Sequence, residues 1–137
     1  MIKVIIPLEP NFIKYKYELK ILYETHQEKI CDPNNFDFIV NNTLFYLFTT
    51  VSDELIGALY YFKDGNKLYF NGFGKRGYLT EKIECLKTSL DWFNCDIYAE
   101  AQNRASAFCL LRAGFKRVKD KLFVCKKQKK KGKSYDI

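Results

Sequence analysis

The sequence predicts an α/β fold, a single domain in which a mixed sheet of about seven strands carries helices on both faces. Segments with apolar residues every three or four positions alternate with short segments rich in β-branched and aromatic residues. A helix separates the fourth and fifth predicted strands, which requires a parallel crossover, whereas the tight turns elsewhere require antiparallel pairs. The 137 residues, 47% of them hydrophobic, are enough for one core.

The N-terminal part of the chain predicts one strand and two helices. Residues 2–8 are rich in Ile and Val and predict a short strand. Pro10 begins a helical stretch whose apolar residues are spaced by three and four positions: Phe12, Tyr15, Leu19 and Leu22. Asp32 and Pro33 have the pattern of an N-cap followed by a first-turn proline. We therefore expect a second, short helix that carries Phe36, Ile39 and Val40.

The middle of the chain predicts three consecutive strands joined by tight turns. β-Branched and aromatic residues dominate the three segments, at residues 43–51, 55–62 and 68–73. The first turn reads "SDE", and the second has Asp64 and Gly65 at its centre, a dipeptide typical of two-residue hairpins. Glycines at positions 72, 74 and 77 then interrupt the pattern.

The C-terminal third predicts two helices and three strands. Thr80 is expected to begin a helix with a four-and-three spacing of apolar residues: Leu79, Ile83, Leu86, Leu90 and Phe93. Residues 95–101 predict a strand, and residues 103–115, "NRASAFCLLRAGF", predict a short helix with a polar cap and a glycine stop. Two final strands, at residues 115–118 and 122–127, flank Lys119 and Asp120.

Composition excludes several classes of protein. Five cysteines without a close CxxC pair indicate neither a disulfide framework nor a zinc site, and no metal is expected. His26 is the only histidine, so a Ser-His-Asp triad has little support. The longest uncharged run, residues 38–52, is too short to span a bilayer, and the N-terminus lacks a signal-peptide pattern. We expect a cytoplasmic protein without a membrane segment.

The positive charge is concentrated at the C-terminus. Residues 126–137 carry +5 of the total net charge of +7, so residues 1–125 form a nearly neutral body. A lysine run of this kind is usually a solvated, disordered terminus. The other interpretation is an electrostatic contact with nucleic acid or another acidic partner, which should be weak, independent of sequence and sensitive to salt.

The segment "IYAEAQNRASAFCLLRAGFKRV" resembles the GCN5-related N-acetyltransferase (GNAT) family. Family members often have a strand ending near a Glu, then an Asn, a small residue three positions later, and Gly-Phe eleven and twelve positions after the Asn. The matching residues here are Glu100, Asn103, Ser106, Gly114 and Phe115. The segment "ELIGALYYF" is similar to the third strand of the family, and the order of elements also agrees. The resemblance implies an acyl-CoA N-acyltransferase-like fold.

The resemblance also implies a site for acetyl-coenzyme A. In the family this molecule lies where two parallel strands separate, with its pyrophosphate on backbone N–H groups at the start of the following helix. The loop "KRGYLTEK" departs from the family signature, because Tyr78 and Thr80 stand at two small-residue positions and Gly77 falls one place early. The implied cofactor-binding residues are Phe73, Lys75, Arg76, Gly77, Tyr78, Leu79, Thr80, Asn103 and Ser106. Thr80 is expected to cap the helix. The carboxylate of Glu81, in the first helical turn, would repel a bound phosphate.

The implied catalytic residues are Glu100, Asn71 and Tyr98. Glu100 is the candidate general base, although a solvent-facing or helix-capping carboxylate fits the same position. Asn71 and Tyr98 would position an amine or a water, and N–H groups near Phe73 would polarise the thioester carbonyl. Many members place a Tyr seven residues after the Asn as general acid, where this sequence has Leu110; the adjacent Cys109 is expected to face elsewhere. General acid catalysis commonly contributes ~10²–10⁴-fold, so a slower enzyme is expected.

Two functions follow from these residues. The first is an N-acetyltransferase that transfers the acetyl group of acetyl-coenzyme A to an amine of a protein, peptide or small molecule. The alternative is a catalytically weak or inactive binding module of the same fold that contacts nucleic acid or an acidic partner through its lysine-rich tail. Asn103, Ser106, Lys75 and Arg76 favour the first function, and the degenerate loop and Leu110 favour the second.

Overall fold

Seven strands and four helices follow one another in the order expected from the sequence. The structure is a computed structural model that describes residues 1–127. The strands are β1 (Ile2–Ile5), β2 (Leu44–Thr50), β3 (Leu55–Asp64), β4 (Lys67–Gly74), β5 (Ile97–Glu100), β6 (Lys116–Lys119) and β7 (Leu122–Cys125). The helices are α1 (Asn11–His26), α2 (Phe36–Asn42), α3 (Leu79–Leu90) and α4 (Arg104–Arg112). No helix in residues 1–127 has the length and apolarity needed to cross a membrane.

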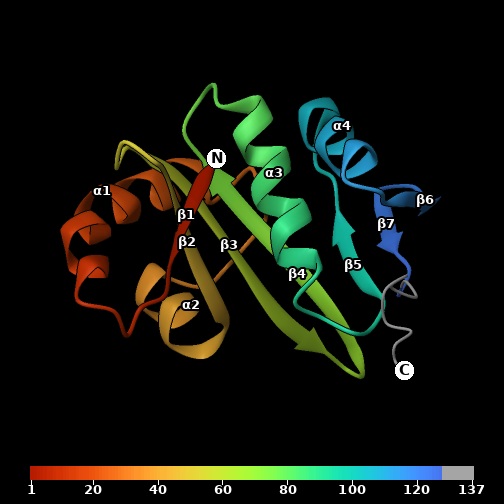
Figure 1. Cartoon of the computed structure of the whole chain (residues 1–137). Coiled ribbons are helices and arrows are strands. Elements are labelled where there is room, and N and C mark those ends of the chain that lie inside the picture. The colour runs from red at the N-terminus through yellow and green to blue at the C-terminus, as the bar shows by residue number, and fades with distance from the viewer. Residues whose placement is uncertain (128–137) are drawn as a thin grey trace, which may run out of the picture.

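All seven strands form one sheet, in the order β1-β2-β3-β4-β5-β7-β6 (Figure 1). β4 and β5 pair in parallel, and the other neighbours pair antiparallel. The parallel pair occurs where α3 connects the two strands, because a crossover returns the chain to the same end of the sheet. The predicted mixed sheet is therefore confirmed.

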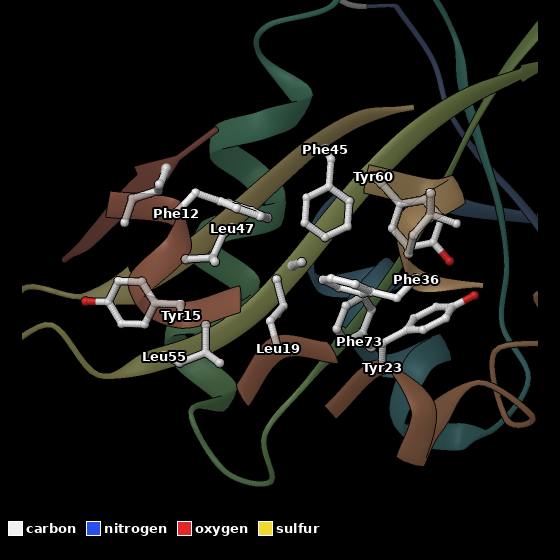
Figure 2. Packing of buried hydrophobic residues seen from close by; sticks show 13 residues of the cluster. Phe12, Tyr15, Leu19, Tyr23, Phe36, Phe45, Leu47, Leu55, Tyr60 and Phe73 are labelled. Carbon is white, nitrogen blue, oxygen red and sulfur yellow. The ribbon is translucent and has the colours of Figure 1, made fainter. Parts of the chain in front are cut away.

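One face of the sheet is covered by α1 and α2. The buried cluster between these helices and the sheet is largely aromatic. Figure 2 shows its labelled residues: Phe12, Tyr15, Leu19, Tyr23, Phe36, Phe45, Leu47, Leu55, Tyr60 and Phe73. The sequence predicted that Leu22 would complete the apolar stripe of α1. Tyr23 is fully buried instead and Leu22 is only half-buried, since a step of four residues from Leu19 fits a 3.6-residue helix as well as a step of three.

The opposite face of the sheet is covered by α3 and α4. Side chains alternate along β3, so Tyr60 packs under α1 and α2 while Tyr61 packs in the cluster with Leu86 of α3 and Leu110 of α4. The buried Tyr61 hydroxyl lies 2.6 Å from Ser89 Oγ, and burial raises its pKa above the usual range. Helices on both faces confirm the predicted layers.

A hydrogen bond from the Tyr60 hydroxyl fixes the segment between α1 and α2. Asp32 was expected to cap α2, but Asn35 is the N-cap, and its Oδ1 accepts the N–H of Phe38 at 2.8 Å. The Asp32 carboxylate instead accepts the hydroxyl of Tyr60 at 2.6 Å and the N–H of Asn34 at 2.9 Å. The predicted cap was therefore wrong, because the Tyr60 hydroxyl binds the Asp32 carboxylate and Asn35 caps the helix in its place.

The first two residues of the predicted lysine-rich tail contact the body. The N–H of Lys127 donates to Asp96 Oδ1 at 2.7 Å, and Lys126 Nζ lies 3.4 Å from the same carboxylate. The hydrogen bond from Lys127 is the main reason that the pKa of Asp96 is lowered. The remaining tail residues lie outside the described part of the chain, so the tail's mobility stays a prediction.

Candidate active site

β4 and β5 separate before either strand ends. They are paired only at Leu68 with Ile97 and at Tyr69 with Tyr98. β4 nevertheless continues to Gly74 and stays paired with β3 along that whole length. Beyond the two parallel pairs, the C-terminal ends of β4 and β5 diverge, as Figure 1 shows. A gap between the ends of parallel strands is a common place for ligand sites in α/β proteins.

Backbone N–H groups of β4 face this gap. The N–H of Lys75 donates to Ile56 O of β3 at 2.9 Å, and the N–H of Gly72 donates to the side chain of Asn71 at 2.9 Å. Successive residues of a strand direct their backbone groups to opposite edges. The alternation therefore turns the N–H of Phe73 toward β3, and those of Gly72 and Gly74 toward the gap. Because the N–H of Gly72 is bonded to Asn71, the N–H of Gly74 is the one near Phe73 that is left to donate into the gap, and its polarising role stays a prediction.

A cavity of about 320 Å³ occupies the gap. Its wall combines β3, β4, β5 and the two helices α3 and α4 with the end of α1. Five of the predicted site residues line it: Asn71, Phe73, Glu100, Asn103 and Ser106. The cavity has a predominantly apolar floor that includes Leu59, Phe70 and Leu86. An apolar pocket with a few polar groups is the usual form of a small-molecule site.

The start and end of α4 have the predicted geometry. Asn103 is the N-cap, and its Oδ1 accepts the N–H of Ser106 at 2.8 Å. This leaves the Asn103 Nδ2 amide, a donor, on a residue that also lines the cavity. Gly114 has φ +108, and the N–H of Phe115 donates to Leu110 O at 2.9 Å, which closes the helix in a Schellman motif.

The loop between β4 and α3 lies beside the cavity and does not form its wall. None of residues 75–80 lines the cavity. The Lys75 ammonium is 2.5 Å from the carboxylate of Glu18 in α1, so it is already paired, while Arg76 and Gly77 are exposed. Tyr78 turns its hydroxyl to Glu54 at 2.9 Å. The phosphate contacts predicted for this loop stay predictions.

The predicted start of α3 at Thr80 was wrong. Tyr78 is the N-cap residue, with a left-handed backbone at φ 56, and α3 begins at Leu79. No side chain caps this helix start. Because Gly77 also has a positive φ, of +88, two successive residues turn the chain from β4 into the helix before Thr80 is reached.

Lys82 places a cation in the cavity wall that the sequence reasoning missed. Its side chain extends from the first turns of α3 along Gly74, and its Nζ donates to the carbonyl oxygen of Lys75. Burial is the main cause that lowers the pKa of Lys82, and the neighbouring Cys109 partly opposes it. Cys109 was expected to face away from Leu110, but both residues line the cavity. Burial raises the pKa of the Cys109 thiol.

A second set of polar residues lies at the end of the cavity near α1. Ile97 and Ala99 pack under α3 and α4, so alternation directs Tyr98 and Glu100 to the face that α1 and α2 cover. Asn71 and Glu100 each lie two residues beyond the last parallel pair, Tyr69 with Tyr98, and both line the cavity. The Asn71 Nδ2 donates to Ile30 O at 3.2 Å. Asn71 and Glu100 therefore share the wall of one cavity.

Tyr98, the third predicted catalytic residue, is not among the residues that line the cavity. Its ring lies 5.6 Å from that of Tyr69, and the Lys67 ammonium is 5.0 Å from its centroid. The cavity instead reaches His26 and Lys29, which end α1 and begin the following segment. The sequence positions of His26 and Lys29 do not predict that they line this cavity, because only the tertiary packing of α1 on β4 brings them there.

Comparisons with known proteins identify the fold. No protein-family model matches the sequence, and no curated protein matches it. The structure is similar to the crystal structure of an acetyltransferase of the GNAT family from Staphylococcus aureus Mu50, with a TM-score of 0.60. The two share 15% identity, and the match covers 92% of this chain and 99% of that chain. The chain therefore has a GNAT-like, acyl-CoA N-acyltransferase fold.

Proposed function

We propose that this protein is an N-acetyltransferase that uses acetyl-coenzyme A and acetylates an amine of a protein, peptide or small molecule. The observation that carries the proposal is the separation of β4 from β5, which leaves the N–H of Gly74 directed toward a cavity beside the capped helix α4. The GNAT-like fold supports the same class of reaction.

The donors around the cavity fit a thioester with an amide-containing arm. Acetyl-coenzyme A would supply an activated acetyl group. The N–H of Gly74 is fixed by the sheet, so it can stabilise negative charge that develops on a carbonyl oxygen without moving. Asn103 Nδ2 and the hydroxyl of Ser106 offer further hydrogen bonds from α4. The apolar floor limits the access of water to the reacting atoms.

Asn103 should contribute both to the stability of α4 and to the binding of acetyl-coenzyme A. Replacing it by alanine should lower the free energy of unfolding by about 1 kcal/mol, because the N-cap is lost. The affinity for acetyl-coenzyme A should fall about fivefold through the loss of one hydrogen bond. Urea unfolding and calorimetric titration measure the two effects.

Asn35→Ala is the matched control for this variant. Asn35 caps α2 with the same side-chain hydrogen bond, 2.8 Å to the N–H of Phe38, and it does not line the cavity. Its loss should lower the stability similarly and leave the affinity unchanged. Equal affinities in the two variants would mean that Asn103 is a cap alone.

Lys82 should bind a phosphate of acetyl-coenzyme A more effectively than Lys75. Charge-assisted hydrogen bonds are about twice as strong as neutral ones, and Lys82 has no carboxylate partner among the described residues, whereas Lys75 is paired with Glu18. We expect Lys82→Met to weaken binding about tenfold, an effect typical of losing a hydrogen bond to a charged group. Lys75→Met should change the affinity much less.

Calorimetric titration of both variants at low and high salt tests this prediction. Lys87→Met is a suitable control, since Lys87 is exposed on the same helix and does not line this cavity. A larger loss of affinity in Lys75→Met than in Lys82→Met would place the phosphates on the loop, as the sequence predicted.

The positioning role predicted for Asn71 remains a proposal, and Glu100, predicted as the general base, is proposed to attract the acceptor amine. Glu100 is exposed, and its carboxylate lies 3.4 Å from Gln102 Nε2, in a position to attract a cationic amine. Leu110 stands where many relatives have a tyrosine, so the departing thiolate would take its proton from water. A thiolate is a fair leaving group, and a slower reaction is expected.

Titration of acetyl-coenzyme A into the purified protein, followed by a screen of amines with thiol release as the readout, tests the proposal. Binding must raise the melting temperature, since the ligand stabilises the folded state. No heat and no thermal shift at high micromolar concentration would exclude this function. Binding without thiol release for any amine would favour the inactive binding module, which Leu110 and the paired Lys75 also support.

Contact of the lysine-rich tail with nucleic acid remains a secondary proposal. Most of its residues lie beyond residue 127, outside the described part of the chain. Their lysines favour binding that is weak, independent of sequence and steeply reduced by salt.

A further inference from the structure

We propose that His26 is the base that takes the proton of the acceptor amine. The assignment rests on the proposed acetyl transfer. His26 is the last residue of α1, it is half-buried, and it lines the cavity together with Asn71 and Glu100. Its position is fixed by the packing of α1 on β4, through contacts such as the Tyr23 and Phe73 rings, whose centroids are 5.2 Å apart.

The hydrogen bond of the imidazole ring determines which nitrogen can act. His26 Nδ1 lies 2.9 Å from the carbonyl oxygen of Leu22. A carbonyl oxygen only accepts, so Nδ1 must carry the hydrogen in this contact. In the neutral ring, Nε2 then has a free lone pair. A backbone carbonyl that holds Nδ1–H is a common way to orient a histidine and to set its tautomer.

The other titratable residues in the cavity wall are less suited to this role. They are Lys29, Lys82, Cys85, Cys109 and Glu100. The two lysines donate when charged, and burial raises the pKa of both thiols, which keeps them protonated. Glu100 is the single carboxylate in this wall, but it is exposed and lies 3.4 Å from the donor Gln102 Nε2. His26 is half-buried, and the bond of its Nδ1 to Leu22 O leaves Nε2 as the acceptor.

The proposed step is balanced in atoms and charge. Nε2 of His26 takes one proton from the acceptor nitrogen, whose lone pair attacks the thioester carbonyl carbon. A C–N bond forms, the C–S bond breaks, and its electron pair leaves on sulfur. The acylated nitrogen loses its second proton, which passes through water to the sulfur. The imidazolium returns its proton to water. Glu100, across the gap, attracts the cationic acceptor and stabilises its approach.

His26→Asn is the decisive variant. The Asn Nδ2 takes the place of the imidazole Nδ1, so it can still donate to Leu22 O at the end of α1, while the basic Nε2 is lost. We expect the melting temperature to be unchanged. With acetyl-coenzyme A and ethylamine, which is protonated at neutral pH, thiol release should fall about 100-fold, the usual loss for a general base. With methoxyamine, which is uncharged at neutral pH, it should fall less than about threefold, because little deprotonation is needed. Added imidazole should restore the rate with ethylamine.

Three results would overturn the assignment. The first is a full rate of His26→Asn with ethylamine. The second is an equal loss with both amines, which would indicate a structural role. The third is a selective loss with ethylamine in Glu100→Gln but not in His26→Asn. Wild-type protein that binds no acetyl-coenzyme A and releases no thiol with either amine would contradict the proposed function itself, and the assignment with it.

Discussion

Replacing Gly57 by alanine should lower the free energy of unfolding by about 3 kcal/mol, at the upper end of the range for overpacking. A Cβ atom on Gly57 would lie 2.2 Å from the carbonyl oxygen of Phe73 and 2.6 Å from the Cα of Gly74. Both atoms belong to the backbone of β4, so no side-chain rotation can relieve the clash. β4 would have to move away from β3, and the N–H groups that face the cavity would move with it.

Gly72→Ala is the matched control in the neighbouring strand. Its Cβ would meet Leu59 Cδ2 at 2.5 Å, which is the end of a flexible side chain, and Ala58 O at 3.1 Å. We expect a loss of about 1 kcal/mol, at the lower end of the same range. Urea unfolding of both variants, with acetyl-coenzyme A titration, tests the comparison. Similar stabilities for the two variants would mean that the backbone of β4 can shift away from residue 57 at little cost in free energy.

Phe45→Ala should cost about 3–5 kcal/mol of folding free energy, as for other buried phenylalanines. Phe45 belongs to the cluster in Figure 2, with ring centroids of Phe12, Phe36 and Tyr60 within 6.2 Å and that of Phe73 at 6.5 Å. Its ring joins α1 and α2 to β3 and β4. Truncation would leave a cavity that the close-packed side chains around it cannot fill.

Phe38→Ala provides the comparison. Phe38 is on α2 but 47% exposed, so its loss should change the stability by less than about 0.5 kcal/mol, as for most surface positions. Chemical unfolding monitored by circular dichroism measures both variants. A loss below about 1 kcal/mol in Phe45→Ala would contradict the view that this cluster holds α1, and with it His26, against the sheet.

The sequence by itself determined the order of the elements and the ends of several of them. These features depend on residues close together in the chain. The Asp64 and Gly65 turn, the alternation along β3, and the cap and stop of α4 at Asn103 and Gly114 are set by local backbone preferences and by side-chain hydrogen bonds within one turn. The parallel pairing of β4 and β5 followed from the helix between them.

Local rules did not resolve competition between neighbouring polar residues. Asp32 and Asn35 both suit a helix cap, and only the buried Tyr60 hydroxyl, 28 positions away, decides that Asp32 is used elsewhere. Thr80 suits a cap as well, but the backbone turn at Gly77 and Tyr78 brings the start of α3 forward to Leu79.

The tertiary structure decided the composition of the cavity. Lys75 looked like a phosphate ligand in its loop, yet the packing of α1 brings Glu18 to its ammonium, and Lys82 enters the wall instead. His26 reaches the same cavity although 45 residues separate it from Asn71, because the aromatic core docks α1 onto β4. Which charges meet in a gap between strands depends on contacts that are distant in sequence, and sequence spacing carries no information about them.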